Sequence, residues 1–480
     1  MSGRKTYQQS PSGQKSDYAN RASEANRPVR KQSFKGKGKS GHWLWLWMGF
    51  TGVAMLSATA GALVAVSLSS KPFQQSLLRP DEAAMFSQGG SIATGNMHLP
   101  ELTRPVNILV LGTKVLASDL QEKETDKPAY ELINSFEGNT DTMLLLRFDP
   151  EAKRLTTLSI PRDTRAYIDG HGTTKINAAN VYGGPALTAK TVSELLGGVG
   201  IDRYIRVNVQ GVQSLVDALG GVTVYVPQDM KYKDDSQHLY INLKKGKQHL
   251  DGEKALQLLR FRYDKNGDIG RVQRQQLVMR ALTEQALNPA TLSRLPKILS
   301  VIQSHIDTNL SVEELVALVS FGVQTNRSNM QMLMVPGQFN GDGRHDVSYW
   351  LPDKRGIQRM VARYFDQGFS ETREVNPAYL RIAVQDSTGQ PDAAASLVKN
   401  LQEAGYRNIS IDHDWHEPLR VTRIVAQQGD PHSATAIRGH LGLGEVRVES
   451  TGNLGSDVTI QLGQDWLQKE TSSQPRFSTY

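Results

Sequence analysis

Two apolar stretches decide the fold. Residues 106–112 read Val-Asn-Ile-Leu-Val-Leu-Gly, and residues 141–160 read Asp-Thr-Met-Leu-Leu-Leu-Arg-Phe-Asp-Pro-Glu-Ala-Lys-Arg-Leu-Thr-Thr-Leu-Ser-Ile. Short apolar runs bounded by turn residues are typical of buried strands, and Asp-Pro is a turn signal. We therefore predict three strands, over residues 107–112, 141–148 and 154–160.

Helical patterns follow these strands along the chain. Ser311-Val-Glu-Glu314 is a capping box ahead of an apolar run, and Gly220 ends a stretch with apolar residues on one helical face. Strands and helices mix throughout, so we predict an α/β class, with α+β as the alternative, in which helices flank a central mixed sheet. The predicted helices cover residues 186–196, 208–219, 253–259 and 271–287, and a further strand covers residues 222–226.

The N-terminal region differs in composition from the rest. The formal net charge of the 480 residues is +7, and residues 1–42 hold ten basic and two acidic side chains, so the remainder is close to neutral. This tail has almost no aliphatic side chains, and we predict that it is disordered. Residues 43–70 contain no charged side chain and begin with three alternating tryptophans. Their length and composition predict one transmembrane helix.

The basic tail sets the predicted orientation of this helix. By the positive-inside rule the N-terminus stays in the cytoplasm and the body lies on the extracytoplasmic or periplasmic side of the plasma membrane, as a single-pass protein. The alternative is a cleaved signal peptide, because Ala58 and Ala60 have A-x-A-like spacing. We favour the anchor because the apolar stretch is longer than a signal-peptide core of about 15 residues.

The body divides into two predicted domains. Residues 71–104 lack sustained periodicity and are predicted to form a stalk, residues 105–371 form a large domain, residues 377–465 a small α/β domain, and residues 466–480 a tail. The small domain contains Gly389-Gln-Pro391 and Gly429-Asp-Pro431, each between a predicted strand and a predicted helix. This recurrence predicts two related β-α-β units.

Many kinds of catalytic centre are excluded by the sequence. The chain has no cysteine, which excludes disulfides, a thiolate nucleophile and cysteine-ligated metal sites. It contains no H-E-x-x-H, G-x-S-x-G or Walker motif, and no G-x-G-x-x-G follows a predicted strand.

Arginines and aspartates instead recur together between residues 141 and 275. Arg271, Arg274 and Gln275 share one face of a predicted helix at its N-terminal end, where cations repel one another and oppose the helix dipole. A bound anion with several oxygens would relieve both effects, and arginine matches phosphate geometry. Asp141 and Asp268 then become candidates for a magnesium ligand or a base. Ordinary surface ion pairs are the alternative explanation for each cluster.

These motifs also occur in a characteristic order. Between Val106 and Leu282 the chain reads N-I-L-V-L-G, T-D-T-M-L-L, L-S-I-P-R-D-T, K-I-N-A-A, L-D-G-E-K-A-L, and R-F-R followed by G-D-I-G-R-V-Q-R-Q-Q. This series resembles the LytR-CpsA-Psr family of cell-wall glycopolymer phosphotransferases. The C-terminal units resemble the LytR C-terminal domain that often follows the catalytic domain of this family.

The resemblance implies an extracytoplasmic phosphotransferase. It would move a glycopolymer with its linking phosphate from a polyprenyl-pyrophosphate carrier in the membrane bilayer to a peptidoglycan acceptor, with Mg²⁺ as cofactor held by Asp141. The implied catalytic residues are Asp141, Arg162, Arg260, Arg262, Asp268 and Arg271. The implied substrate-binding residues are Arg165, Lys175, Arg274 and Gln275.

Two positions depart from the family pattern. Lys114 stands where an acidic residue is usual, and Asn139 stands where an arginine is usual. We expect Lys114, or an acid such as Asp119, to compensate. A pyrophosphate-lipid-binding scaffold without turnover is therefore an alternative function. A membrane-bound transcriptional attenuator is another, but the tail has no helix-turn-helix pattern, and we expect no nucleic-acid partner.

Overall fold

A computed structural model gives the structure of the protein. It describes residues 73, 75–86, 90–94, 100–113, 136–235, 239–261, 267–326, 329–341, 347–366 and 376–473. The predicted disordered tail (1–42) and transmembrane helix (43–70) lie outside these residues. Within them, every helix is too short or too polar to span a bilayer.

The large domain is built on a six-stranded sheet. Its strands, in spatial order, are β13 (Ile306–Thr308), β8 (Arg203–Val207), β3 (Val106–Thr113), β4 (Thr140–Asp149), β5 (Arg154–Ser159) and β14 (Met330–Met334). The pairs β8–β3 and β5–β14 are parallel, and the other three are antiparallel. The prediction of a central mixed sheet flanked by helices is confirmed, and so are its first three strands to within two residues.

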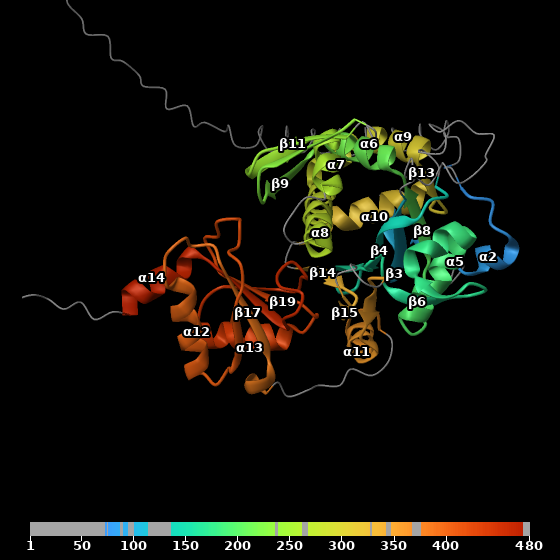
Figure 1. The fold of residues 1–480 in the computed structure, drawn as a ribbon. Helices are drawn as coiled ribbons and strands as arrows, with labels where there is room; N and C mark the ends of the chain where they lie inside the picture. Colours follow the sequence, from blue (N-terminus) through green and yellow to red (C-terminus); the bar gives the residue numbers. More distant parts are fainter. Residues whose placement is uncertain are drawn as a thin grey trace, which may run out of the picture. The chain divides into compact units, whose positions relative to one another are not determined.

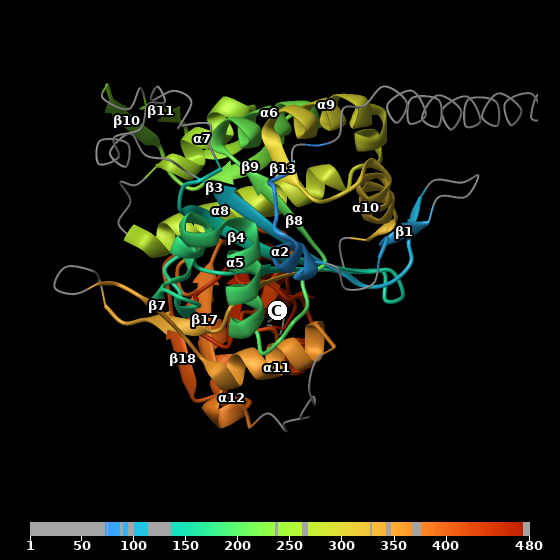
Figure 2. The ribbon, with the colours of Figure 1, turned by 90° about the vertical axis from the view of Figure 1, so that its right-hand side faces the viewer.

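Helices cover both faces of this sheet. On one face, Leu109, Leu145 and Leu158 pack in a common core with α5 (Ala179–Leu195) and α11 (Lys354–Tyr364). On the other face lie α8 (Gly267–Ala286) and α10 (Val312–Gln324). Figure 1 shows α5 and α8 on opposite sides of β3 and β4, and in Figure 2 α5 lies on the side toward the viewer.

The remaining elements of this domain are short hairpins and edge helices. Helices α6 (Val209–Leu219) and α9 (Leu295–His305) pack against β8 and the edge strand β13. The predicted capping box is confirmed, because Ser311 Oγ accepts from Glu314 N at 3.1 Å and Ser311 N donates to Glu314 at 3.0 Å. The other elements are α2 (Pro80–Ala84), β1 (Ala93–Thr94), β2 (Glu101–Leu102), β6 (Arg165–Ile168), β7 (Gly172–Lys175), η1 (Ile176–Ala178), β9 (Val222–Val226), β10 (Met230–Asp234), β11 (Leu239–Leu243), β12 (Gly246–Leu250), α7 (Gly252–Arg260), η2 (Pro289–Arg294), β15 (Gly337–Phe339) and β16 (Trp350–Pro352).

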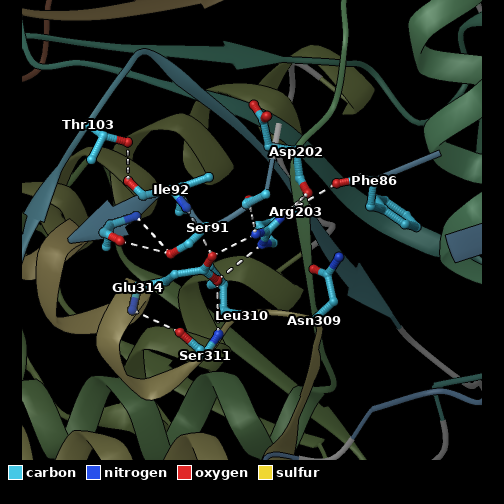
Figure 3. A network of polar contacts seen from close by, with 12 residues as sticks. Phe86, Ser91, Ile92, Thr103, Asp202, Arg203, Asn309, Leu310, Ser311 and Glu314 are labelled. Atoms are coloured by element: carbon cyan, nitrogen blue, oxygen red, sulfur yellow. Dashed lines mark hydrogen bonds and ion pairs between the residues drawn. The ribbon is translucent and has the colours of Figure 1, made fainter. Parts of the chain in front are cut away.

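The segment predicted as a stalk makes specific contacts with the body where it is described. Arg203 on β8 donates to both carboxylate oxygens of Glu314, at 3.1 and 2.6 Å, and also to the backbone oxygens of Phe86 and Gly90. Ile92 N donates to the same Glu314 at 3.3 Å. Figure 3 shows this network joining three parts of the chain. Phe86, Gly90 and Ile92 are thereby held against β8 and α10.

The small C-terminal domain has a five-stranded sheet of its own. Its order is β18 (Asn408–Ile411), β17 (Arg381–Asp386), β21 (Val458–Leu462), β19 (Arg423–Ala426) and β20 (Glu445–Arg447), after a short η4 (Pro377–Tyr379). The parallel pairs β17–β18 and β19–β20 are connected through α12 (Ala393–Glu403) and α13 (Pro431–Leu441), and α14 (Gln464–Ser473) ends the domain. The two predicted β-α-β units are therefore present.

The two domains share an interface. Met332 on β14 accepts from Ser450 N at 2.8 Å and donates to Val448 O at 2.9 Å, which adds one bridge to the edge of the central sheet. Arg280 on α8 pairs with Glu449 at 3.3 Å. The C-terminal domain thus contacts β14 and α8, the two elements that border the site described next.

Candidate active site

A narrow pocket lies between the sheet and helix α8. Its cavity volume is about 30 Å³, and it opens to solvent. Because alternate residues of a strand face one side of a sheet, Leu144 on β4 and its partner Ser159 on β5 point into it together. Much of its wall is apolar, and the apolar lining residues are Met143, Leu144, Ile160, Pro161, Met279, Met332, Leu333 and Phe339.

The wall of this pocket also carries a charged cluster. Arg162 Nη1 donates to Asp141 Oδ1 at 2.6 Å, and Arg162 Nε donates to Asp163 Oδ2 at 3.3 Å. Lys175 Nζ donates to the other oxygen of Asp163 at 2.7 Å. Burial disfavours the Arg162 cation, but the charges of Asp141 and Asp163 outweigh it, so its pKa is raised above the usual value. The structure therefore brings together three predicted residues, Asp141, Arg162 and Lys175.

A tight turn holds Arg162 at the end of β5. Thr164 is buried, and both its backbone N and its Oγ1 donate to Pro161 O, at 2.9 and 2.6 Å. Trp350 N donates to Asp163 O at 2.9 Å. Because the backbone of the turn is tied to neighbouring elements on both sides, the arginine is presented on a rigid support.

Helix α8 supplies the opposite wall. Gln275 lines the pocket, and its Nε2 donates to Asp141 O at 3.4 Å. Arg274 is 4% exposed, and its Nη2 donates to Phe261 O at 2.6 Å, which ties α8 to the residue after α7. Burial lowers the pKa of Arg274 to about 10, so the side chain stays cationic at neutral pH.

Other predicted residues lie elsewhere or outside the described part. Arg260 is the last residue of α7, and Arg165 lines a separate groove. Asp268 and Arg271 belong to the first two turns of α8, but the structure does not describe their side chains. Three further residues, Arg262, Lys114 and Asp119, lie outside the described part of the chain. Asn139 is described and exposed.

Sequence reasoning missed two kinds of site residue. Asp163 directly follows Arg162 and joins it to Lys175, so the P-R-D-T motif contained the signal. Met279 lies one helical turn after Gln275 and lines the same pocket. The spacing of four residues predicts that Met279 and Gln275 share one face of the helix. Whether that face lines a pocket depends on which strands lie opposite the helix.

The carboxylates in the pocket wall can supply two of the ligands of a magnesium ion. Asp141 and Asp163 both contact one guanidinium, so two carboxylates lie within reach of one small site. The described residues contain no group of three or more acidic or histidine side chains placed so that they could hold a metal ion. Since Mg²⁺ commonly binds through one or two carboxylates, water and substrate phosphate oxygens, this set fits the ion when a phosphate is present.

Comparison with known proteins agrees with these features. The model of the LytR_cpsA_psr family matches residues 78–365. The chain belongs to this family. A second model, described as LytR cell envelope-related transcriptional attenuator, matches residues 379–466 and covers the small C-terminal domain.

Two relatives and one solved structure are similar to this family member. The polyisoprenyl-teichoic acid–peptidoglycan teichoic acid transferase TagV of Bacillus subtilis is 30% identical over 64% of this chain and 76% of its own length. TagU of Bacillus cereus, a transferase of the same description, is 34% identical over 52% of this chain and 75% of its own. The crystal structure of B. subtilis TagV matches 55% of this chain and 99% of its own at 29% identity, with a TM-score of 0.46.

Proposed function

We propose that the protein is a phosphotransferase that moves a glycopolymer with its linking phosphate from a polyprenyl-pyrophosphate carrier to peptidoglycan. One observation carries the proposal: an apolar pocket has Arg162, Asp141 and Asp163 in its wall. A polyprenyl pyrophosphate has the same two parts, an apolar chain and a charged diphosphate. The names of the relatives TagV and TagU support transfer from a polyisoprenyl carrier to peptidoglycan.

The apolar and charged lining sets the orientation of the donor. The polyprenyl chain lies along Leu144, Met279 and Met332, which must move apart to admit it, since burial of apolar surface is favourable by about 25 cal/mol per Å². The diphosphate then lies at Arg162, whose guanidinium can form two parallel hydrogen bonds to phosphate oxygens. Arg274 adds positive potential from α8.

Transfer needs one bond to form and one to break. A sugar hydroxyl oxygen of the acceptor attacks the phosphorus that bears the glycopolymer, and the bond from that phosphorus to the bridging oxygen breaks. Polyprenyl monophosphate leaves with the bridging oxygen, and the hydroxyl proton is released to water. Reactions of this kind depend on positioning and charge stabilisation, which Arg162 on its rigid turn can supply.

Binding of the donor requires the charged cluster to rearrange. Two cations, Arg162 and Lys175, are matched by Asp141 and Asp163, so the arginine is engaged by carboxylates before a phosphate arrives. Mg²⁺ would be held by Asp141, with Asp163 as the nearest second carboxylate, and would neutralise phosphate charge when bound. A carboxylate bound to the ion would leave Arg162 available to phosphate oxygens.

Membrane anchoring completes the proposal. A lipid-linked donor remains in the bilayer, and the charge-free stretch at residues 43–70 would hold the body beside it on the extracytoplasmic side of the plasma membrane. Reporter fusions after residue 71 should then be active only outside the cytoplasm. A mature protein that begins near residue 61 would show cleavage in place of anchoring.

Mass spectrometry of ligand retained by the purified full-length chain tests donor binding. We expect polyprenyl phosphates or pyrophosphates in the wild-type protein and much less in Arg162→Ala. Product formation with a defined lipid-linked donor and peptidoglycan then separates a transferase from a binding scaffold. Retained lipid without product would favour the scaffold, and absence of both would contradict the proposal.

A further inference from the structure

A second hollow lies on the side of the sheet opposite the pocket. This β6–α11 groove is open, has a volume of about 740 Å³, and is bounded by β6, the C-terminal end of α5 and the first turns of α11. Figure 1 shows β6, α5 and α11 together on that side of the sheet. The groove is lined by Arg165, Ala166, Tyr167, Thr191, Glu194, Leu195, Leu196, Gly197, Pro352, Lys354, Ile357, Gln358 and Val361.

The groove combines an exposed aromatic ring with hydrogen-bonding groups. Tyr167 is 59% exposed, although a tyrosine ring is usually at least partly buried. The charged and amide side chains around it are Arg165, Glu194, Lys354 and Gln358. A sugar ring has an apolar face of C–H bonds and an edge of hydroxyl groups, so this lining suits a glycan. Arg165 and Lys354 additionally suit carboxylate substituents.

Two segments of the chain form walls of both the pocket and the groove. The turn after β5 places Arg162 and Asp163 in the pocket, and Arg165 follows in the groove. The β15–β16 hairpin places Phe339 in the pocket and Pro352 in the groove. Three residues span at most about 11 Å of chain, so the groove approaches the charged cluster to within the length of a short oligosaccharide.

The shared wall is rigid. Trp350 on β16 bonds to the turn through Asp163 O at 2.9 Å, and its indole Nε1 donates to Val335 O at 3.1 Å. Ile176 N donates to Thr164 O at 2.8 Å. A fixed separation between two cavities is what a two-substrate transfer needs, because donor and acceptor must meet at one phosphorus atom in a defined geometry.

We propose that the groove binds the acceptor glycan, an oligosaccharide with amide and carboxylate substituents, and that Tyr167 supports one of its sugar rings. This inference rests on the proposed function and adds the site of its second substrate. The acceptor hydroxyl reaches the donor phosphorus past the Arg162–Arg165 turn. It attacks with the bond changes given above, and polyprenyl monophosphate is released toward the pocket.

Steady-state kinetics of transfer by the full-length chain test this site. The assay uses a lipid-linked donor and a soluble peptidoglycan oligosaccharide as acceptor. Tyr167→Ala should raise the acceptor KM by about three- to tenfold, the range for one lost aromatic contact. The donor Kd should stay within about twofold, and Tyr167→Phe should restore the acceptor KM. Lys354→Gln is the second variant, and it should also raise the acceptor KM. Tyr240→Ala is the matched control, because Tyr240 on β11 is 50% exposed and does not line the groove.

The outcomes separate the two proposals. An unchanged acceptor KM in both Tyr167→Ala and Lys354→Gln overturns the acceptor site, as does an equal loss of donor affinity. If the wild-type chain retains donor lipid but forms no product, the transferase function fails. Direct titration with the oligosaccharide then tests the acceptor site in the groove. Equal affinities of wild type and Tyr167→Ala would overturn that site.

Discussion

Two arginine–carboxylate clusters in the large domain have similar chemistry and different surroundings. In the Arg203–Glu314 cluster the side chains are 12% and 5% exposed. In the Arg162–Asp141 cluster they are 25% and 29% exposed, and both residues line the pocket. The first cluster joins β8, α10 and the segment before β3 through five hydrogen bonds, of which Arg203 donates four and Ile92 N donates one. The second joins the ends of β4 and β5.

The difference separates a structural role from a ligand-binding role. The hydrogen-bonding groups of Arg203 and Glu314 are directed at protein partners on several sides, which leaves little capacity for a ligand. Arg162 is held by carboxylates beside a pocket, where a phosphate or a metal ion can exchange with them. Substitution in the first cluster should therefore affect stability, and substitution in the second should affect binding.

The largest expected effect is on stability in the first cluster. Glu314→Gln should lower the free energy of unfolding by about 3–5 kcal/mol, because it leaves the buried Arg203 charge without its carboxylate. Urea or thermal unfolding of the full-length chain measures this. Arg79→Ala is the control, since Arg79 is 73% exposed and its ion pair should contribute at most about 1 kcal/mol. A loss below about 1 kcal/mol in Glu314→Gln would remove the distinction between the clusters.

The second expected effect is on donor binding at the Arg162–Asp141 cluster. Arg162→Ala should weaken donor affinity by about 1.5–3 kcal/mol, or roughly tenfold to more than a hundredfold, through loss of a charge-assisted phosphate contact. Its stability should change by less than about 1 kcal/mol. Arg154→Ala is a matched control, because Arg154 is the first residue of β5, the strand that precedes the Arg162 turn, is 26% exposed, and pairs with Asp149 at 3.2 Å. Equal donor affinities in the two variants would contradict the phosphate role.

A smaller effect concerns pH. Burial alone would raise the pKa of Glu314, but hydrogen bonds from Arg203, Ser311 and Ile92 outweigh it and hold the pKa below its ordinary 4.5. The folded state binds this proton less tightly than the unfolded state, so the stabilisation is present above about pH 4.5 and is lost as pH falls through the lowered value. The stability advantage of wild type over Glu314→Gln should therefore begin to decrease below about pH 4.5 and continue to decrease as pH falls further. A constant difference down to pH 3 would show that the pKa is not lowered.

The smallest effect lies at the domain interface. Glu449→Gln removes the partner of Arg280 on α8, and we expect a loss of about 1 kcal/mol or less in stability, since Arg280 keeps Glu284 at 3.5 Å. Because α8 carries Gln275 and Met279, donor affinity should fall by about twofold or threefold without loss of fold. Glu445→Gln is the control, because Glu445 pairs within the C-terminal domain. Identical donor affinities in both variants would indicate that this interface does not position α8.

The sequence by itself determined the local structure. Apolar runs located β3, β4 and β5, and the Ser311–Glu314 capping box located the start of α10, because these signals depend on residues close together in the chain. The paired G-x-P turns likewise predicted the two β-α-β units. For the same reason the sequence identified Arg162 and Asp141 as candidates for one site through their motifs.

Only the tertiary structure decided which side chains meet. Asp141 contacts Arg162 because β4 and β5 pair in one register, and Arg203 contacts Glu314 across 111 positions of sequence. Arg165 lies only three positions from Arg162 but lines the β6–α11 groove, because the chain turns at Thr164 and enters β6. Strand order, register and the direction of each side chain depend on contacts between distant segments, and no local pattern in this sequence contains them.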